Sequence, residues 1–153
     1  MKKQENTNII ALNRKAKHNY HLYFHIEVGI CLTGWEVKSI RAGKVQISDS
    51  YVIVKKEEIY LIGTIITPLS TVSSHFIPEP SRTRKLLLKK KEIIKLIGQI
   101  KQKGLSIIPT SMYWKKNHIK LEIALAKGKK VYDKRASIKE KEWDRRKAKL
   151  FKK

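Results

Sequence analysis

The chain has 153 residues, enough for one domain with a sizeable hydrophobic core. Its formal net charge of +22 favours a polyanionic partner, either nucleic acid or an acidic membrane surface. No apolar run approaches the roughly 20 residues of a membrane-spanning helix, and the N-terminus lacks the apolar core of a signal peptide, so we expect a cytoplasmic protein.

Alternating apolar residues open the predicted fold. They are Tyr20, Leu22, Phe24, Ile26, Val28, Ile30 and Leu32. Successive side chains of a strand point to opposite faces, so this spacing predicts one long strand with one buried face. The other face is mostly polar and available to water or a ligand. We expect the strand to bend at Gly29, because glycine in a strand often marks a bend.

A short helix is predicted directly after this strand. Thr33 and Glu36 have the spacing of a capping box, in which each side chain satisfies a backbone donor at the start of a helix. The helix is expected over 34–42. Gly43 would end it, because glycine adopts the left-handed conformation with little strain.

The rest of the body reads as short strands and one longer helix. Further strands are predicted over 9–12, 44–47, 51–54, 59–66, 105–114 and 119–126. A proline-containing loop is expected over 67–84, and an amphipathic helix over 85–103 that stops at Gly104. About six strands and two helices predict a mainly β protein with α, a small closed or nearly closed antiparallel barrel with helices packed outside.

The composition changes after this body, which defines three regions. Residues 1–8 are expected to be flexible, residues 9–126 form the barrel domain, and residues 127–153 form a basic tail. The tail holds thirteen Lys or Arg against four Asp or Glu. A second capping box predicts a helix from about Ile138. Because its apolar surface is small, we expect this helix to be marginal alone and to form on a partner.

The sequence offers no catalytic constellation. The candidates for a metal or acid–base cluster are His18, His21, His25 and Glu27, yet on a strand His18 faces away from the other three. Histidines on a half-exposed strand are usually surface residues. The single Cys31 excludes an internal disulfide and a cysteine-rich zinc site, and we expect it to be a small packing residue. No enzyme activity, metal or cofactor is predicted.

Basic residues before and within the second helix favour RNA binding. They are Arg82, Arg84, Lys85, Lys89, Lys90, Lys91 and Lys95. An ordinary solvated surface explains any one of them, but together they suit neutralisation of phosphates with release of counterions. Tyr132 and Trp143 lie among the basic residues of the tail, where aromatic rings suit stacking on unpaired bases.

Glu27 is unusual in so basic a chain, and it has two interpretations. It could form a cross-strand ion pair with a lysine such as Lys120. Alternatively, it could accept a hydrogen bond from a base amino group, since a carboxylate can read a base edge but repels phosphate.

Three segments resemble the signature segments of a known family. They are GWEVKSIRAGKVQISDSYV (34–52), RTRKLLLKKKEI (82–93) and ALAKGKKVYDKR (124–135). They resemble the SmpB family, which binds the transfer-messenger RNA of bacterial trans-translation. The similarity runs in register from about Ile9 to Phe151. The resemblance implies an oval β-barrel related to the oligonucleotide-binding barrels.

The resemblance also implies a function. Such a protein binds the tRNA-like domain of transfer-messenger RNA, replaces its missing anticodon arm and enters stalled ribosomes with it. There its tail contacts small-subunit RNA at the decoding centre and lies in the empty mRNA channel. We expect a monomer that binds one RNA and no membrane. The alternatives are a general basic RNA-binding or ribosome-associated protein of the same barrel class, and an RNA-modifying enzyme or nuclease.

The site residues follow from matching positions. The RNA-binding set is Glu27, Leu87, Lys120, Lys38, Arg41, Arg82, Arg84 and Lys85, of which the resemblance implies the first three. The decoding-centre and mRNA-channel set implied by the resemblance is His18, Tyr132, Asp133, Lys134, Arg135, Trp143, Leu150 and Phe151. Two departures are noted: Val28 stands where the family usually has Ala, and the chain extends only two lysines beyond the last of these positions.

Overall fold

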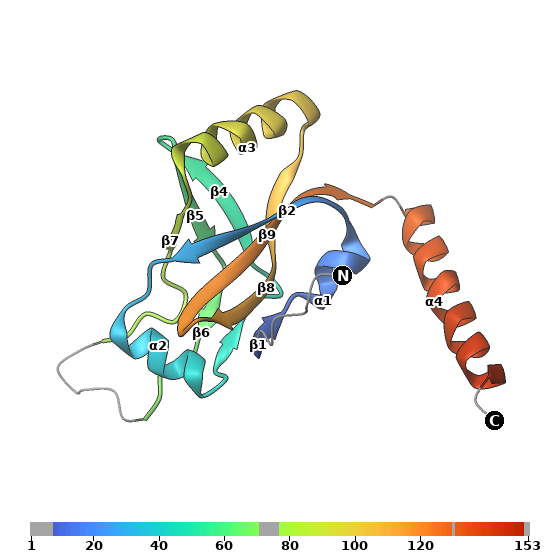
Figure 1. Cartoon of the computed structure of the whole chain (residues 1–153), viewed down its shortest axis with the longest axis horizontal. Helices are drawn as coiled ribbons and strands as arrows, with labels where there is room; N and C mark the ends of the chain where they lie inside the picture. The colour runs from blue at the N-terminus through green and yellow to red at the C-terminus, as the bar shows by residue number, and fades with distance from the viewer. Residues whose placement is uncertain (1–7, 71–76, 130, 152–153) are drawn as a thin grey trace.

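Antiparallel strands form the body of the protein in the computed structural model, which describes residues 8–70, 77–129 and 131–151 (Figure 1). The strands are β1 (Asn8–Leu12), β2 (Tyr20–Ile30), β3 (Val45–Gln46), β4 (Tyr51–Lys55), β5 (Glu58–Ile62), β6 (Ile65–Ile66), β7 (Arg84–Leu87), β8 (Ser106–Lys115) and β9 (His118–Gly128). The helices are α1 (Arg14–Asn19), α2 (Gly34–Arg41), α3 (Lys90–Lys103) and α4 (Val131–Phe151). The predicted mainly antiparallel β class with some helices is confirmed. Within the described ranges, no helix is both long and apolar enough to cross a bilayer.

Six strands pair with one another in a ring. The order is β8–β4–β5–β7–β2–β9, and β9 pairs again with β8. Strand β1 adds to β8, while β3 and β6 form a small separate sheet. Helices α2 and α3 lie at opposite ends of the ring, and α4 projects away from it (Figure 1). Because each strand of the ring has a neighbour on both sides, the ring has no open edge strand.

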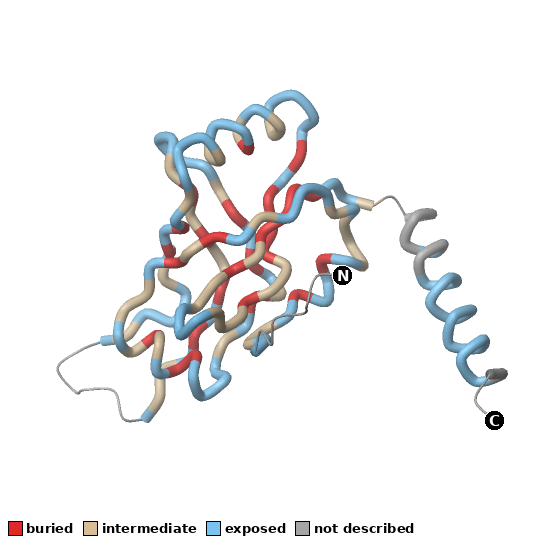
Figure 2. The backbone as a smooth tube through the Cα atoms, viewed as in Figure 1, coloured by how far each residue is buried: buried red, intermediate tan, exposed pale blue. Residues whose placement is uncertain are grey.

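Aliphatic side chains fill the inside of the ring. Buried members of this core include Val28, Ile40, Ile59, Leu61, Leu86, Leu96, Ile107, Met112, Leu121 and Ile123. Burying one such side chain contributes about 1.5–3 kcal/mol through removal of apolar surface from water. Figure 2 shows the buried positions gathered on the strands, whereas α4 is exposed wherever its side chains are described.

Strand β2 bends at a bulge and not at the predicted glycine. Consecutive residues of β9 pair with Tyr23 and His25, so Phe24 is the extra residue. Phe24 has a φ of 46°, a left-handed conformation that costs a non-glycine residue about 1–2 kcal/mol. The bend predicted at Gly29 is wrong, because that residue stays in regular register with β7 and β9.

The bulge also splits the predicted single buried face of β2 into two. After it, Val28 and Ile30 face the core of the ring. Before it, Tyr20 and Leu22 pack beside Ala16 of α1 in a second, smaller cluster. One extra residue shifts the period-2 alternation by one, so the side that packs changes at the bulge.

Helix α1 was not predicted, because its short sequence read only as a basic segment. The Asn13 side chain caps it by accepting a hydrogen bond from the Ala16 N–H (3.2 Å). The same side chain donates to the Pro109 carbonyl (2.8 Å), which ties α1 to β8. His18 therefore lies on a helix, and its placement on the strand was wrong.

The predicted start and stop of α2 are confirmed. The Glu36 carboxylate accepts hydrogen bonds from the Thr33 N–H (2.8 Å) and the Thr33 hydroxyl (3.0 Å). The helix ends at Arg41, one residue before the predicted end. Gly43 follows with a φ of 74°, the left-handed region expected of a glycine stop.

The helix predicted over 85–103 begins too early. Arg84 and Leu86 are buried and the residues between and after them are exposed, which is the period-2 pattern of β7. The helical apolar stripe starts only at Ile93, and α3 accordingly begins at Lys90. The predicted glycine stop of this helix is confirmed by the φ of 61° at position 104.

The other predicted strands are found close to their expected places. The segment predicted as one strand over 59–66 is two, β5 and β6, interrupted at Gly63, which has a φ of 84°. The hairpin of β8 and β9 turns at Lys116 and Asn117, both with positive φ. Leu121 and Ile123 face the core from β9, as the alternation predicts.

Helix α4 begins before the predicted position. It starts at Val131 and not near Ile138. Neither glycine nor proline occurs between these positions, so no residue stops the helix from extending toward the ring. The described side chains of α4 are all exposed, which agrees with a helix that has little apolar surface to bury.

Candidate nucleic-acid interface

Three of the predicted RNA contacts meet on the outer surface of the ring around a glycine. Gly29 of β2 pairs with Leu87 of β7 on one side and with Lys120 of β9 on the other. Glu27 lies two residues along β2, on the same face. Leu87 is 53% exposed although it is a large apolar side chain. A Cβ added to Gly29 would lie 3.2 Å from the Leu87 Cβ, so the glycine lets the Leu87 side chain lie close against β2.

The Glu27 carboxylate is held by residues of β8. Tyr113 donates a short hydrogen bond to it, and the Lys115 Nζ lies 3.3 Å from both carboxylate oxygens. Burial acts to raise the pKa of Glu27, but these hydrogen bonds outweigh it and hold the pKa below its ordinary value. Lys120 adds electrostatic attraction only. The ion pair proposed for Glu27 therefore exists, but its lysine is Lys115.

A second carboxylate lies directly beside the first. Glu27 is paired in register with Glu122 of β9. Glu122 lies 2.7 Å from the His25 Nδ1 and accepts a longer bond from the Ser111 hydroxyl (3.4 Å). This small acidic strip on a strongly basic protein provides acceptors that suit base amino groups better than phosphates. In the part of the chain that is described, no group of three or more His, Cys, Asp or Glu residues is placed to hold a metal ion.

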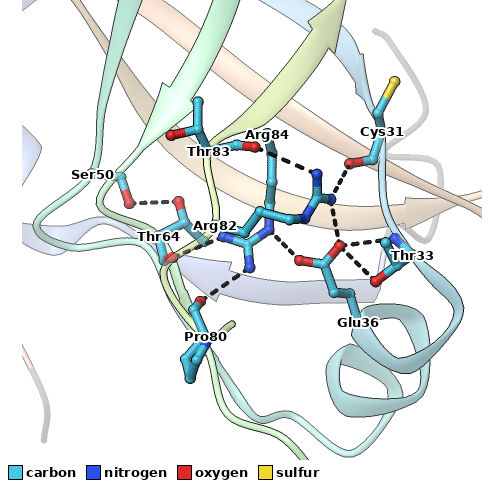
Figure 3. A network of polar contacts seen from close by, with 9 residues as sticks. All are labelled: Cys31, Thr33, Glu36, Ser50, Thr64, Pro80, Arg82, Thr83 and Arg84. Atoms are coloured by element: carbon cyan, nitrogen blue, oxygen red, sulfur yellow. Dashed lines mark hydrogen bonds and ion pairs between the residues drawn. The ribbon is translucent and has the colours of Figure 1, made fainter. Parts of the chain in front are cut away.

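The predicted basic patch divides into buried and exposed members. Arg84 is fully buried, so its assignment as an RNA contact is not supported by its position. Its guanidinium pairs with Glu36 and donates to the carbonyls of Thr64 (2.9 Å) and Pro80 (3.0 Å) (Figure 3). Arg84 thus joins β7 to α2 and to the loop before β7.

Glu36 is the centre of this network and was predicted only as a helix cap. It is fully buried, and Arg82 donates to it at 2.6 Å while also reaching the carbonyl of Cys31 at 3.2 Å (Figure 3). Burial acts to raise the pKa of Glu36, but hydrogen bonds from Arg82, Thr33 and Arg84 hold it below its ordinary value. No local pattern indicates this pairing, because Arg82 and Arg84 come 46 and 48 residues after Glu36 in the chain. Cys31 is exposed, so its prediction as a packing residue was wrong.

The remaining basic members are on the surface. Lys85 lies 3.0 Å from Glu58, which also accepts from Tyr60, and these contacts lower the pKa of Glu58. On α2, Lys38 is exposed. The Arg41 guanidinium lies 5.9 Å from the centre of the Trp114 ring of β8. The predicted RNA-binding set therefore includes exposed cations on two elements, α2 and β7.

Comparison with known proteins places this geometry in a family. A family model described as "SmpB protein" matches residues 10–153. The chain belongs to the SmpB family. The SsrA-binding protein of Pseudoalteromonas atlantica is 54% identical over 151 residues, 99% of this chain and 96% of that protein. The SsrA-binding protein of Coxiella burnetii (strain Dugway 5J108-111) is 52% identical over 143 residues, 94% of this chain and 90% of that protein.

A solved SmpB structure supports the same family. It is described as "tmRNA-SmpB: a journey to the center of the bacterial ribosome" and aligns with a TM-score of 0.64 at 40% identity. The alignment covers 78% of this chain and 84% of that chain. The resemblance noted from three sequence segments is therefore confirmed over nearly the whole chain.

In the second predicted set of this SmpB family member, His18 lies next to the start of the tail. The Lys129 N–H donates to the Asn19 carbonyl (2.9 Å), which holds the end of β9 against the end of α1, next to His18. On α4, Arg135 and Trp143 are exposed. The side chains of five further members lie outside the described residues: Tyr132, Asp133, Lys134, Leu150 and Phe151.

Proposed function

We propose that this chain binds the tRNA-like domain of transfer-messenger RNA and delivers it to stalled ribosomes for trans-translation. The proposal rests on one observation above all: residues far apart in the sequence meet around Gly29 on the outer surface of a chain that belongs to the SmpB family along its length. The protein is an RNA-binding partner and not an enzyme in this role. Its place of action is the bacterial cytoplasm, where ribosomes translate.

Each side chain of this surface has a role that suits folded RNA. Leu87 offers an exposed apolar contact for an unstacked base. Glu27 accepts from base amino groups, and its lowered pKa keeps it ionised at neutral pH. Lys120 and Lys115 contact phosphates. Arg84 is left out of this surface, because its guanidinium is buried.

The body and the tail have different roles in this proposal. The ring of strands is a small barrel of the oligonucleotide-binding type, and one such barrel holds one RNA as a monomer. The part of the tail that follows β9 occupies the decoding centre and the empty mRNA channel, where it is helical. His18 lies beside the start of the tail. It contacts the decoding centre together with the tail.

The specific role predicts a strong preference among RNAs. Affinity for the tRNA-like domain should exceed affinity for ordinary tRNA by at least about tenfold at near-physiological salt, because both offer similar phosphates and only the former fits the surface around Gly29. Filter binding or fluorescence anisotropy with both RNAs measures this. Equal affinities would leave only a general basic RNA-binding barrel protein.

Lys120 and Lys116 provide a matched pair for the site itself. Lys120→Ala should weaken binding of the tRNA-like domain several-fold and reduce the slope of log K against log salt by about 1, because one phosphate contact is lost. Lys116→Ala removes the same charge from the exposed hairpin turn and should change affinity less than twofold. Equal effects of the two variants, or affinity that is independent of salt, would contradict a phosphate contact at Lys120.

A further inference from the structure

A cavity of about 640 Å³ lies between α3 and the bulge of β2. Helix α3 lies at one end of the ring (Figure 1). Tyr23 and Phe24 line it from β2, Lys95 and Lys103 from α3, and Lys127 from β9. Three of the described residues that line it are lysines and none is acidic. The cavity is therefore both aromatic and positively charged, the combination that suits a nucleotide in single-stranded RNA.

The two aromatic side chains that line the cavity are exposed and do not belong to the core clusters. Tyr23 is 48% and Phe24 45% exposed. Phe24 is also the bulged residue with a left-handed backbone, which a large side chain adopts only at a cost. Strain of this kind at an exposed aromatic residue is more typical of a binding site than of a core. The Lys95 Nζ lies over the Phe24 ring, 4.5 Å from its centre, so one face of the ring already contacts a cation.

The cavity is on the other side of the β2–β9 ribbon from the surface around Gly29. Tyr23 pairs with Leu125, which faces the core of the ring, whereas Glu27 pairs with Glu122 on the outer surface. Side chains of directly paired residues lie on the same side of a sheet. An RNA held at Glu27 therefore does not reach this cavity through the same contact.

We infer that this cavity binds an unpaired nucleotide of ribosomal RNA, with the base stacked on the aromatic rings and the phosphates held by the lysines. The inference rests on the proposed function, because Lys127 lies close before α4 and the RNA nearest the start of the tail is then that of the ribosome. Besides His18 and the tail, the protein would then contact the ribosome through β2, α3 and the end of β9.

Two pairs of variants test this site. Phe24→Gly removes the ring and relieves the left-handed strain, so the melting temperature should be equal or higher, while affinity for purified bacterial ribosomes should fall about tenfold. A ring needed only for packing would instead lower the melting temperature and leave ribosome affinity unchanged. Lys95→Gln should weaken ribosome binding several-fold, and Lys101→Gln, the same change on an exposed part of α3 that does not line the cavity, should have less than a twofold effect.

Photocrosslinking identifies the RNA. With Phe24→p-azidophenylalanine in the full chain, added to purified ribosomes together with transfer-messenger RNA, we expect a crosslink to ribosomal RNA. A crosslink to transfer-messenger RNA or to a ribosomal protein, or no crosslink, would overturn the inference. In all variants, affinity for the isolated tRNA-like domain should stay within twofold of wild type. If the unmodified chain did not bind the isolated tRNA-like domain, the proposed function would fail. That outcome is distinct from failure of the inference about the cavity.

Discussion

Glu36→Gln is expected to lower the free energy of unfolding by about 3–5 kcal/mol, the usual cost of breaking a buried ion pair from one side. Glu36 is fully buried and is the acid partner of both Arg84 and Arg82. The amide of Gln still accepts a hydrogen bond, so the helix cap is largely kept while the charge is lost. Arg84 would then be a buried cation without its carboxylate, which is why the effect should be large.

Urea unfolding followed by circular dichroism measures this loss, and Glu58→Gln is the matched control. Glu58 also pairs with a cation of β7, Lys85, but both side chains are partly exposed. The control should change stability little, because exposed ion pairs contribute little. A double variant, Glu36→Leu with Arg84→Met, should recover part of the lost stability, since both buried charges are removed together. Equal losses for Glu36→Gln and Glu58→Gln would contradict the central role of the buried pair.

The same carboxylate makes stability depend on pH. The pKa of Glu36 is lower in the folded protein than its ordinary value of 4.5. Its contribution to stability is therefore complete above pH 4.5 and is lost as the pH falls from there through the folded pKa. Melting temperatures of wild type should drop across this acidic range more steeply than those of Glu36→Gln, which has no carboxylate to protonate at this position.

Removal of residues 131–153 is expected to abolish tagging on stalled ribosomes while affinity for the tRNA-like domain stays within about threefold of wild type. The surface around Gly29 belongs to the ring, and the described side chains of α4 are exposed and do not contribute to the core. The tail carries much of the positive charge, so a small loss of affinity from reduced electrostatic attraction is included in that limit.

The comparison requires both measurements on the same truncated protein. RNA binding is measured with the isolated tRNA-like domain, and tagging with purified ribosomes stalled on an mRNA without a stop codon. Unfolding by urea should remain cooperative, which controls for damage to the ring. Equal loss of RNA binding and tagging would show that the body and the tail are not separate parts of the function.

The site could be predicted only in part from the sequence, because the residues that meet there are far apart in the chain. Glu27, Leu87 and Lys120 were assigned through the family resemblance, and strand pairing across long separations brings the last two onto Gly29. One interpretation paired the Glu27 carboxylate with a lysine such as Lys120, and the lysine that pairs is Lys115, because register decides which of two lysines on neighbouring strands lies within reach. Pairing over such distances is not encoded in any local pattern.

Local patterns determined the elements that depend on neighbours in the chain. The capping box at Thr33, the glycine stops at 43 and 104 and the alternation in β9 depend on contacts within a few residues, and the structure contains all of them. The charge of +22 and the three family segments likewise indicated an RNA-binding protein without any knowledge of the fold. These features are properties of short segments or of the whole composition.

Tertiary structure alone decided the burial of Arg84, the bulge at Phe24 and the strand β7. A charged arginine is expected on the surface. Arg84 is buried here because Glu36, which lies 48 residues earlier on α2, neutralises its charge. Phe24 forms a bulge that interrupts the alternation, because β2 packs on α1 at one end and on the ring core at the other. In each case a favourable contact with a distant segment outweighs the local preference. Sequence patterns show only the local preference.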